Sequence, residues 1–306
     1  MAPHYQRCRD ERGHYHAMKI LVLGANGQLG TDLLAEGGRR NKVEMRGLTR
    51  SELDMENLEA IPQILRDYPA DVIVNCTSYH KTDEVEDNGT KAVTINAHAV
   101  EALAKAADEQ GARFVHVSTD YVFDGTNSTP YRESDTPAPI NVYGATKYLG
   151  ETLARRASKD ALILRVASLF GVAGASGKGG NFVEAMLRLA KEHGQLRVVN
   201  DVRMSPTSTR TIAYFLLELL EKQADAGIYH VVNSGDATWY EFATEIIKLV
   251  GWDIPVHPVT SDEFPTRAAR PEYSVLSNQK LSEAVSGCPE HWNDALKEYL
   301  AKKGYL

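Results

Sequence analysis

Short, continuous apolar runs alternate with stretches of helical periodicity through the first half of the chain. An apolar run without alternation is typical of a strand buried on both faces, and helices between such strands indicate a parallel sheet covered on both sides. The pattern therefore predicts an α/β protein with a doubly wound parallel sheet. The predicted strands are Lys19–Leu23, Val43–Leu48, Asp71–Cys76, Arg113–Ser118 and Ala161–Val166, and the predicted helices are Gln28–Glu36, Glu56–Asp67 and Lys91–Gln110.

The pattern changes after Gly171, where a loop of mostly glycine and alanine extends to Gly180. We expect residues 1–17 to form a mobile extension and residues 18–170 to form the sheet domain. Residues 171–306 should form mainly a smaller C-terminal lobe, interleaved with the last sheet elements. The elements predicted there are the helices Phe182–His193, Thr209–Gln223 and Trp239–Val250 and the strands Leu196–Asn200 and Gly227–Val232, followed by an irregular, proline-punctuated tail.

Composition narrows the class of protein. The 306 residues are 43% hydrophobic and 25% charged, with a net charge of −7, which argues against nucleic acid or an anionic membrane as partner. No apolar run approaches the ~18 residues of a spanning helix, and residues 1–17 lack the apolar core of a secretory signal. The cysteines Cys8, Cys76 and Cys288 are too far apart to suggest a disulfide framework or a zinc site, so no metal is predicted and the cytoplasm is the expected location.

A glycine motif of the form GxxGxxG lies between the first predicted strand and the first predicted helix. Gly24 allows the tight turn, Gly27 a close backbone approach to a pyrophosphate, and Gly30 close packing of helix on strand. This context predicts a Rossmann-type dinucleotide-binding domain over residues 18–170. The expected cofactor contacts in the motif are Gly24, Asn26, Gly27, Gln28, Leu29 and Gly30.

The end of the second predicted strand bears on the choice of cofactor. An acidic residue there would bind the ribose 2′-hydroxyl of NAD, whereas this chain has Arg50, which can pair with a 2′-phosphate. NADPH is therefore the expected cofactor, NADH use stays open, and Arg50 could equally be a solvated surface residue. Asp54 is expected to cap the helix Glu56–Asp67, to contact the adenine, or both.

Tyr143 and Lys147 form a YxxxK motif, and residues four apart lie on one face of a helix. Reduction of a carbonyl needs a proton donor for the developing alkoxide, and a neighbouring ammonium should lower the pKa of a phenol enough to serve. Upstream, the strand Arg113–Ser118 runs into Thr119 and Asp120, where a hydroxyl can donate to the carbonyl oxygen. Thr119, Tyr143 and Lys147 are the predicted catalytic residues.

Longer strings match a known family. In order they are GANGQLG (Gly24–Gly30), HVSTDYVFDG (His116–Gly125), NVYGATKYLGE (Asn141–Glu151), GNFVEAMLRLA (Gly180–Ala190), SPT (Ser205–Thr207), GIYH (Gly227–His230), WYEFA (Trp239–Ala243) and ARPEYS (Ala269–Ser274). Over nearly all of Lys19–Trp292 the chain resembles the dTDP-4-dehydrorhamnose reductase family, in the extended branch of the short-chain dehydrogenases/reductases.

The resemblance implies hydride transfer to C4 of dTDP-4-dehydro-β-L-rhamnose, which gives dTDP-L-rhamnose. It also implies that the C-terminal lobe binds the substrate, and it leaves a homodimer open. The implied cofactor contacts are Met55, Ser78, Tyr79, Val117, Tyr143 and Lys147, and the implied substrate contacts are Thr119, Asp120, Ser168 and Asn181.

Departures from the family pattern bear on the sugar. Ser168 stands where the family usually has tryptophan, the loop Thr77–Glu86 differs, and Val202 replaces a glutamine. Two alternatives therefore stay open. One is an epimerase or dehydratase of the extended branch that acts on another nucleotide sugar, and the other is a non-catalytic regulatory subunit such as the methionine adenosyltransferase β subunit.

The pyrophosphate of a nucleotide sugar needs local cations on an acidic protein. Arg270 is the expected cation, because Pro271 restricts its backbone to extended angles that would aim the side chain into the cleft. Arg267 is a weaker candidate, and solvated loop charges are the alternative for both.

Overall fold

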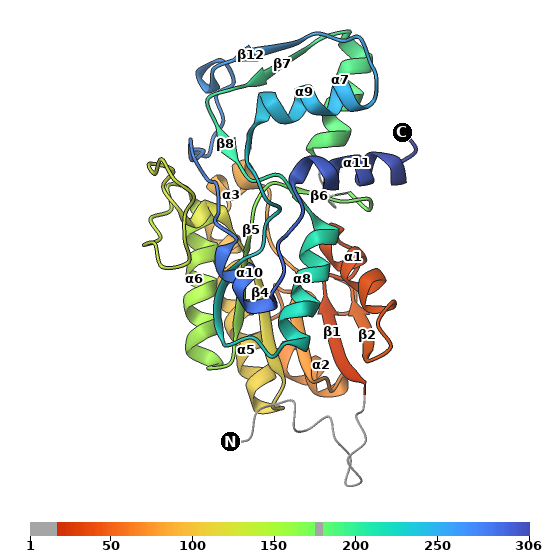
Figure 1. Ribbon diagram of the computed structural model, residues 1–306. Helices are drawn as coiled ribbons and strands as arrows, with labels where there is room; N and C mark the ends of the chain where they lie inside the picture. Colours follow the sequence, from red (N-terminus) through yellow and green to blue (C-terminus); the bar gives the residue numbers. More distant parts are fainter. Residues whose placement is uncertain (1–16, 175–179) are drawn as a thin grey trace.

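The computed structural model describes residues 17–174 and 180–306 and contains a central six-stranded sheet (Figure 1). The strand order is β10-β5-β4-β3-β1-β2, and every neighbouring pair is parallel. The predicted Rossmann-type sheet is thus confirmed. Its strands are β1 (Met18–Leu23), β2 (Val43–Leu48), β3 (Val72–Asn75), β4 (Arg113–Thr119), β5 (Leu162–Val166) and β10 (Gly227–His230).

Both faces of the sheet are covered by helices. Successive side chains of a strand point to opposite faces, and in β1 Ile20 and Val22 join one apolar cluster while Leu21 and Leu23 join the other. This explains why the strand reads as a continuous apolar run. The first cluster packs under α1 (Gln28–Gly37), α8 (Thr209–Glu221) and α10 (Gln279–Val285), and the second under α2 (Ile61–Asp67), α5 (Ala99–Glu109) and α6 (Val142–Ala157).

A smaller lobe lies beyond the carboxyl ends of the sheet strands (Figure 1). It has an aromatic-rich apolar core of its own, in which Phe170, Phe242 and Trp292 are buried. Its elements are β6 (Leu169–Phe170), α7 (Phe182–His193), β7 (Leu196–Val199), β8 (Arg203–Met204), β9 (Thr207–Ser208), β11 (Ala237–Thr238), α9 (Trp239–Leu249), β12 (Val256–Val259) and α11 (Trp292–Lys302).

Several predicted elements differ in the structure. The helix expected from Glu56 begins only at Ile61, with Pro62 in its first turn, where the missing proline N–H costs nothing. The helix expected over Lys91–Gln110 is divided into α4 (Gly89–Val93), a π-helical segment (Thr94–His98) and α5. The tail contains β12, α10 and α11, because prolines at a strand edge and in loops do not prevent regular structure between them.

The expected extension at residues 1–17 lies outside the described residues except for Ala17, as do residues 175–179 of the glycine-rich loop. Among the helices of the described residues, none is long and apolar enough to cross a membrane. The domain boundary near residue 170 stays a prediction.

Candidate active site

The glycine loop joins β1 to α1 at the point where the order of the sheet strands reverses. Gly24 has a φ of +81°, and a Cβ built on Gly30 would lie 2.3 Å from the Gly24 carbonyl oxygen. Only glycine fits at these two positions without a backbone shift. The loop therefore brings bare backbone and the N-terminus of a ten-residue helix to the switch point, as a dinucleotide pyrophosphate requires.

The other residues of this motif contribute in different ways. Asn26 is exposed, whereas Leu29 is buried in the sheet core, so only its backbone faces the loop. Gln28 is also buried, and its Oε1 accepts a hydrogen bond from Asn181 Nδ2. The loop is thus tied to the start of α7 in the smaller lobe.

Arg50, Asp54 and Glu56 form what we call the outer edge, beyond the end of β2. The Arg50 side chain is 71% exposed and pairs with Glu56 Oε1 at 2.9 Å. Asp54 Oδ1 accepts a hydrogen bond from the Glu56 backbone N–H. Since α2 begins at Ile61, the expectation that Asp54 caps that helix is wrong, and the carboxylate instead closes a turn. Met55 beside it is buried in the core.

Ser78, Thr119, Asp120, Tyr143 and Lys147 form what we call the inner wall, where the loop after β3 and the end of β4 face α6. Burial raises the pKa of Tyr143 to about 12, against hydrogen bonds with the Ser78 and Thr119 side chains that lower it. This is the opposite direction from the lowering that the sequence suggested. A phenol in this state is protonated at neutral pH.

Lys147 lies on α6 with its side chain against β4 and is 1% exposed. Its Nζ donates to the Val117 carbonyl oxygen at 2.6 Å and lies 3.2 Å from His116 Nε2. Burial lowers the pKa of Lys147 to about 8, against the charge of Glu151. The ammonium is therefore anchored to β4, and it can lose its proton at mildly alkaline pH.

A residue that the sequence did not single out positions the Ser78–Tyr79 loop. Asn96 lies in the π-helical segment, and its Oδ1 accepts from the Tyr79 backbone N–H at 2.8 Å and from Ser78 Oγ at 3.3 Å. Its Nδ2 donates to Thr146 Oγ1 on α6. Short π-helical segments often lie at functional sites, but the sequence carries no signal for one here.

Ser118 and Thr119 are neighbours at the end of β4 but have different partners. Ser118 Oγ donates to Glu151 on α6, and Glu151 forms a buried bidentate pair with Arg165 on β5. Thr119 faces the inner wall instead, and its Oγ1 donates to Asp120 Oδ1 at 3.0 Å. Of the two hydroxyls, that of Thr119 is the one beside the inner wall, and it would turn from Asp120 to donate to a substrate.

Asp120 is 3% exposed, and its Oδ2 has no hydrogen-bond partner within the described part of the chain. Burial raises the pKa of Asp120 to about 6, against hydrogen bonds from Ser274 and Thr119. The carboxyl group therefore holds its proton to a higher pH than an exposed aspartate. Its unpartnered oxygen is free to accept or donate one further hydrogen bond.

Arg270 reaches the site from the C-terminal tail. Its Nη2 donates to Asp83 Oδ2 at 2.8 Å, its guanidinium lies 5.9 Å from the centre of the Tyr121 ring, and its buried Nη1 has no partner among the described residues. The Tyr121 ring makes an edge contact with Tyr143. Arg267, the weaker candidate, pairs with Asp87 at the surface.

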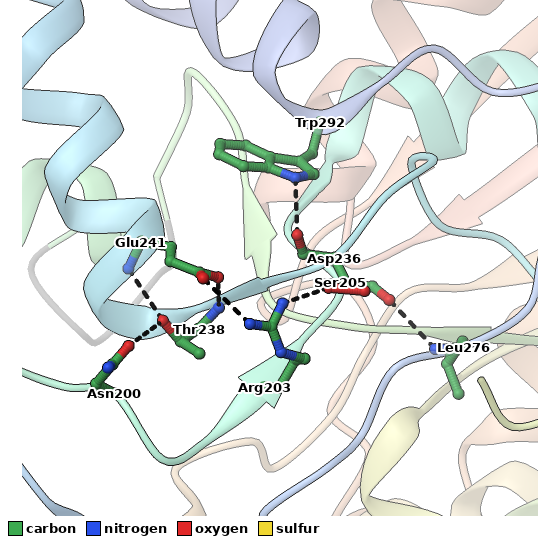
Figure 2. Close-up of polar contacts among 8 residues, drawn as sticks. All are labelled: Asn200, Arg203, Ser205, Asp236, Thr238, Glu241, Leu276 and Trp292. Atoms are coloured by element: carbon green, nitrogen blue, oxygen red, sulfur yellow. Dashed lines mark hydrogen bonds and ion pairs between the residues drawn. The ribbon is translucent and has the colours of Figure 1, made fainter. Parts of the chain in front are cut away.

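The segment that carries Ser274 is fastened to β8 of the smaller lobe. The Arg203 N–H donates to the Glu272 carbonyl oxygen at 2.7 Å, and the Ser274 N–H donates back to the Arg203 carbonyl oxygen at 2.9 Å. Figure 2 shows the Arg203 side chain anchored by Asp236 and Glu241. The smaller lobe thereby determines where Ser274 meets Asp120.

The two remaining predicted substrate residues are placed differently. Ser168 follows β5, is half-buried and has a φ of +45°, a backbone conformation uncommon outside glycine. Asn181 caps α7, and its Nδ2 lies within hydrogen-bonding distance of Gln28, Gly171 and Tyr299. The Asn181 amide thus lies in a buried junction between the lobes.

The Rossmann-type sheet, the glycine loop and the Tyr143–Lys147 pair facing Thr119 place the chain in the extended short-chain dehydrogenase/reductase class. Within that class, a family model described as the RmlD substrate binding domain matches residues 18–304. The chain belongs to this family.

Similarity to named proteins supports this family assignment. Over 285 residues the chain is 39% identical to the spore coat polysaccharide biosynthesis protein SpsK of Bacillus subtilis, covering 93% of this chain and 98% of that protein. A crystal structure of a dTDP-4-dehydrorhamnose reductase from Clostridium acetobutylicum is 38% identical with a TM-score of 0.88, covering 94% of this chain and 100% of that one. The dTDP-4-dehydrorhamnose reductase of Bacillus anthracis was solved in complex with NADP. It is 33% identical with a TM-score of 0.87, covering 94% of this chain and 99% of that one.

Proposed function

We propose that the protein uses NADPH to reduce the C4 carbonyl of dTDP-4-dehydro-β-L-rhamnose, which gives dTDP-L-rhamnose. The observation that carries the proposal is the inner wall, where Ser78 and Thr119 meet the phenol of Tyr143 and Lys147 lies one helical turn away. Family membership and the names of the relatives support the same reaction. A cytoplasmic location and a homodimer stay predictions from the sequence.

The glycine loop fits the proposed cofactor, because the Cβ positions of Gly24 and Gly30 have to be vacant for the loop to close. Bound NADPH would supply the hydride that reaches C4. Backbone groups from Gly24 to Gly30 would hold its pyrophosphate at the N-terminus of α1. Lys147 and the Ser78–Tyr79 loop would line the nicotinamide side, and Arg50 would approach the 2′-phosphate.

The residues of the inner wall account for the proton that the reaction consumes. Tyr143 is protonated at neutral pH because of its raised pKa, so it can donate its proton to the alkoxide that develops at O4. To stabilise the phenolate that remains, the hydroxyls of Ser78 and Thr119 would turn their protons from Asn96 and Asp120 to the Tyr143 oxygen. Thr119 is also placed to orient the carbonyl, and the unpartnered Asp120 Oδ2 is available to a sugar hydroxyl.

Stoichiometric NADPH oxidation with dTDP-4-dehydro-β-L-rhamnose, with the product identified by NMR, tests the proposal. A panel of other nucleotide 4-keto sugars belongs in the same assay, because Ser168 and the loop Thr77–Glu86 depart from the family pattern. If NADPH is oxidised only with a different keto sugar, the proposed substrate is wrong and the reductase activity stands. The absence of oxidation with every keto sugar, despite tight NADPH binding, would overturn the proposed reductase activity.

A further inference from the structure

Asp83 lies in the first turn of α3 (Thr82–Asp87), and both oxygens of its carboxylate are engaged by the C-terminal tail. Its Oδ1 accepts a hydrogen bond from the Ala268 backbone N–H at 3.0 Å, and its Oδ2 accepts from Arg270 Nη2 at 2.8 Å. Ala268 is fully buried. One carboxylate therefore holds the tail backbone and, two residues further on, the guanidinium that we expect at the pyrophosphate of the substrate.

The tail backbone is fixed on both sides of Arg270. Asn141, which caps α6, donates from Nδ2 to the Ala269 carbonyl oxygen at 2.9 Å. Further on, the tail passes so close to Gly125 that a Cβ built there would lie 2.7 Å from the Pro271 Cα. The backbone around Arg270 is thus held in place, and the direction of the side chain depends on what the guanidinium contacts.

The Arg270 guanidinium lies next to two side chains, Asp83 and Tyr121. Its central carbon is 5.9 Å from the centre of the Tyr121 ring, and that ring makes an edge contact with Tyr143 of the inner wall. Nη1 is buried and has no hydrogen-bond partner in the part of the chain that the structure describes. Because a guanidinium is planar and rigid, the bond between Nη2 and Asp83 also fixes the plane in which Nη1 lies.

We propose that Asp83 is a positioning residue that holds Arg270 with Nη1 free to donate to the pyrophosphate of the nucleotide sugar, an inference that rests on the proposed function. The carboxylate and the diphosphate would use different nitrogens of one guanidinium, so the diphosphate does not have to displace Asp83. As a consequence, an acidic residue beside the site should strengthen the binding of an anion.

The charge of Asp83 has two opposing effects on such an anion. The carboxylate repels a bound diphosphate, but its side chain is 44% exposed, so water and salt screen this repulsion. The hydrogen bond to Arg270 orders a long, rotatable side chain before the diphosphate binds, and ordering such a side chain on binding weakens affinity by a few-fold or more. Preorganisation of Arg270 should therefore outweigh the repulsion.

Calorimetric titration with dTDP tests the proposal in the full chain saturated with NADP⁺, so that the pyrophosphate site of the cofactor is filled. In Asp83→Asn one amide oxygen replaces two carboxylate oxygens. This oxygen should stay with the Ala268 N–H, because an unsatisfied buried N–H is costly, and Arg270 then loses its acceptor. We expect the Kd for dTDP to rise about three- to five-fold. An unchanged or lower Kd would overturn the proposal.

Asp87→Asn is the matched control. Asp87 lies one turn further along α3 and pairs with Arg267 at the surface, so the substitution removes the same charge from the same helix and leaves the Arg270 contact in place. Its Kd for dTDP should stay within about two-fold of the unsubstituted protein. An equal rise in the two variants would assign the effect to the charge of the helix instead of Arg270, and the proposal would be wrong.

A double variant shows whether Asp83 acts through Arg270. If it does, Asp83→Asn should not change the Kd for dTDP any further in the Arg270→Ala background, because the two residues act as one unit. If the Kd rises in that background by the same factor as in the unsubstituted protein, the carboxylate only holds the tail and the proposal fails.

Arg270→Lys tests the same geometry with Asp83 intact, so it gives an answer even if Asp83→Asn does not fold. A lysine ammonium is a point charge without the planar fork, so an ammonium paired with Asp83 has no second, fixed nitrogen to offer the diphosphate. The Kd for dTDP should rise nearly as much as in Arg270→Ala. An unchanged Kd in Arg270→Lys would contradict the role given to the Asp83 contact.

None of these titrations involves turnover. If the predicted changes in Kd are not found, or if the unsubstituted protein does not bind dTDP, the role of Asp83 is wrong while NADPH oxidation with a keto sugar still decides the reductase activity. If every keto sugar fails to oxidise NADPH but the predicted changes in Kd are found, the proposed activity is wrong and the role of Asp83 in binding a nucleoside diphosphate stands.

Discussion

The inner wall and the outer edge both hold polar side chains beside the proposed cofactor site, but they hold them in different ways. At the inner wall, Lys147 is 1% exposed and bonded to Val117 and His116 on β4. At the outer edge, the Arg50 side chain is 71% exposed and held by an ion pair with Glu56. Exposed ion pairs contribute little and are screened by salt, whereas loss of a buried polar partner leaves a desolvated group unsatisfied. Substitutions should therefore have large effects at the inner wall and small, salt-dependent effects at the outer edge.

The largest effect is expected for Tyr143→Phe. The phenol donates its proton only as the alkoxide develops, so its removal should lower kcat by at least ~100-fold. NADPH affinity should stay within a few-fold of the unsubstituted enzyme, because the ring remains. Steady-state kinetics together with fluorescence titration of NADPH checks both parts. A variant that keeps more than a tenth of kcat would remove Tyr143 from the role of acid.

This contrast also separates what the sequence could predict from what it could not. Strand and helix positions followed from apolar runs, and the glycine loop and Tyr143–Lys147 followed from short-range spacing, because both depend on residues close in the chain. His116, Asn96 and Ser274 act through partners from distant elements. Nothing in the local sequence indicates that Asn96 lies in a π-helical segment.

The direction in which the pKa of Tyr143 is shifted could not be predicted from the sequence either. The spacing of Tyr143 and Lys147 suggested that the ammonium lowers the phenol pKa, but burial dominates and raises it. The charge of a residue can be read from a sequence, whereas its desolvation depends on the packed structure around it. The same reason explains why Asp54 was expected as a helix cap: the start of α2 is determined by packing and by Pro62, several residues further on.

A pH effect on stability distinguishes buried from exposed groups. His230 is fully buried, its Nδ1 is bonded to the Tyr131 carbonyl oxygen, and burial lowers its pKa to about 3. The unfolded chain takes up this proton below about pH 6.5 but the folded chain does not, so stability falls as the pH is lowered. Between pH 7 and pH 5 this one group should remove about 2 kcal/mol of the free energy of unfolding.

Urea unfolding of His230→Phe at the two pH values checks this effect. The loss of stability on acidification should be about 2 kcal/mol smaller in the variant than in the unsubstituted protein. Asp120, whose pKa is raised to about 6, acts in the opposite direction in both proteins and cancels in the difference. His98→Gln, at an exposed position, is the matched control and should leave the pH dependence unchanged. An equal pH dependence in His230→Phe and the unsubstituted protein would contradict the prediction.

The exposure of Arg270 is intermediate between those of the inner wall and the outer edge. Its side chain is 27% exposed, and its buried Nη1 has no partner among the described residues. Arg270→Ala should raise KM for the nucleotide sugar about ten-fold, the loss of ~1.4 kcal/mol of charge-assisted hydrogen bonding to the pyrophosphate. NADPH binding should not change. Arg267→Ala, which removes a surface cation nearby, is the control and should have no more than a two-fold effect. A substrate KM within two-fold in Arg270→Ala would remove Arg270 from the site.

The smallest effect is expected at the outer edge. Arg50→Ala should raise KM for NADPH by roughly three- to ten-fold and leave KM for NADH unchanged, because only NADPH has a 2′-phosphate. The effect stays below that of a buried contact because Arg50 is exposed and must release Glu56 to reach the phosphate.

Glu56→Gln removes that competing carboxylate and should lower KM for NADPH by a few-fold. Both effects should shrink as salt is raised from ~0.05 to ~0.5 M, because exposed charges are screened. Equal effects of Arg50→Ala on the KM values of the two cofactors would show that the outer edge does not bind the 2′-phosphate.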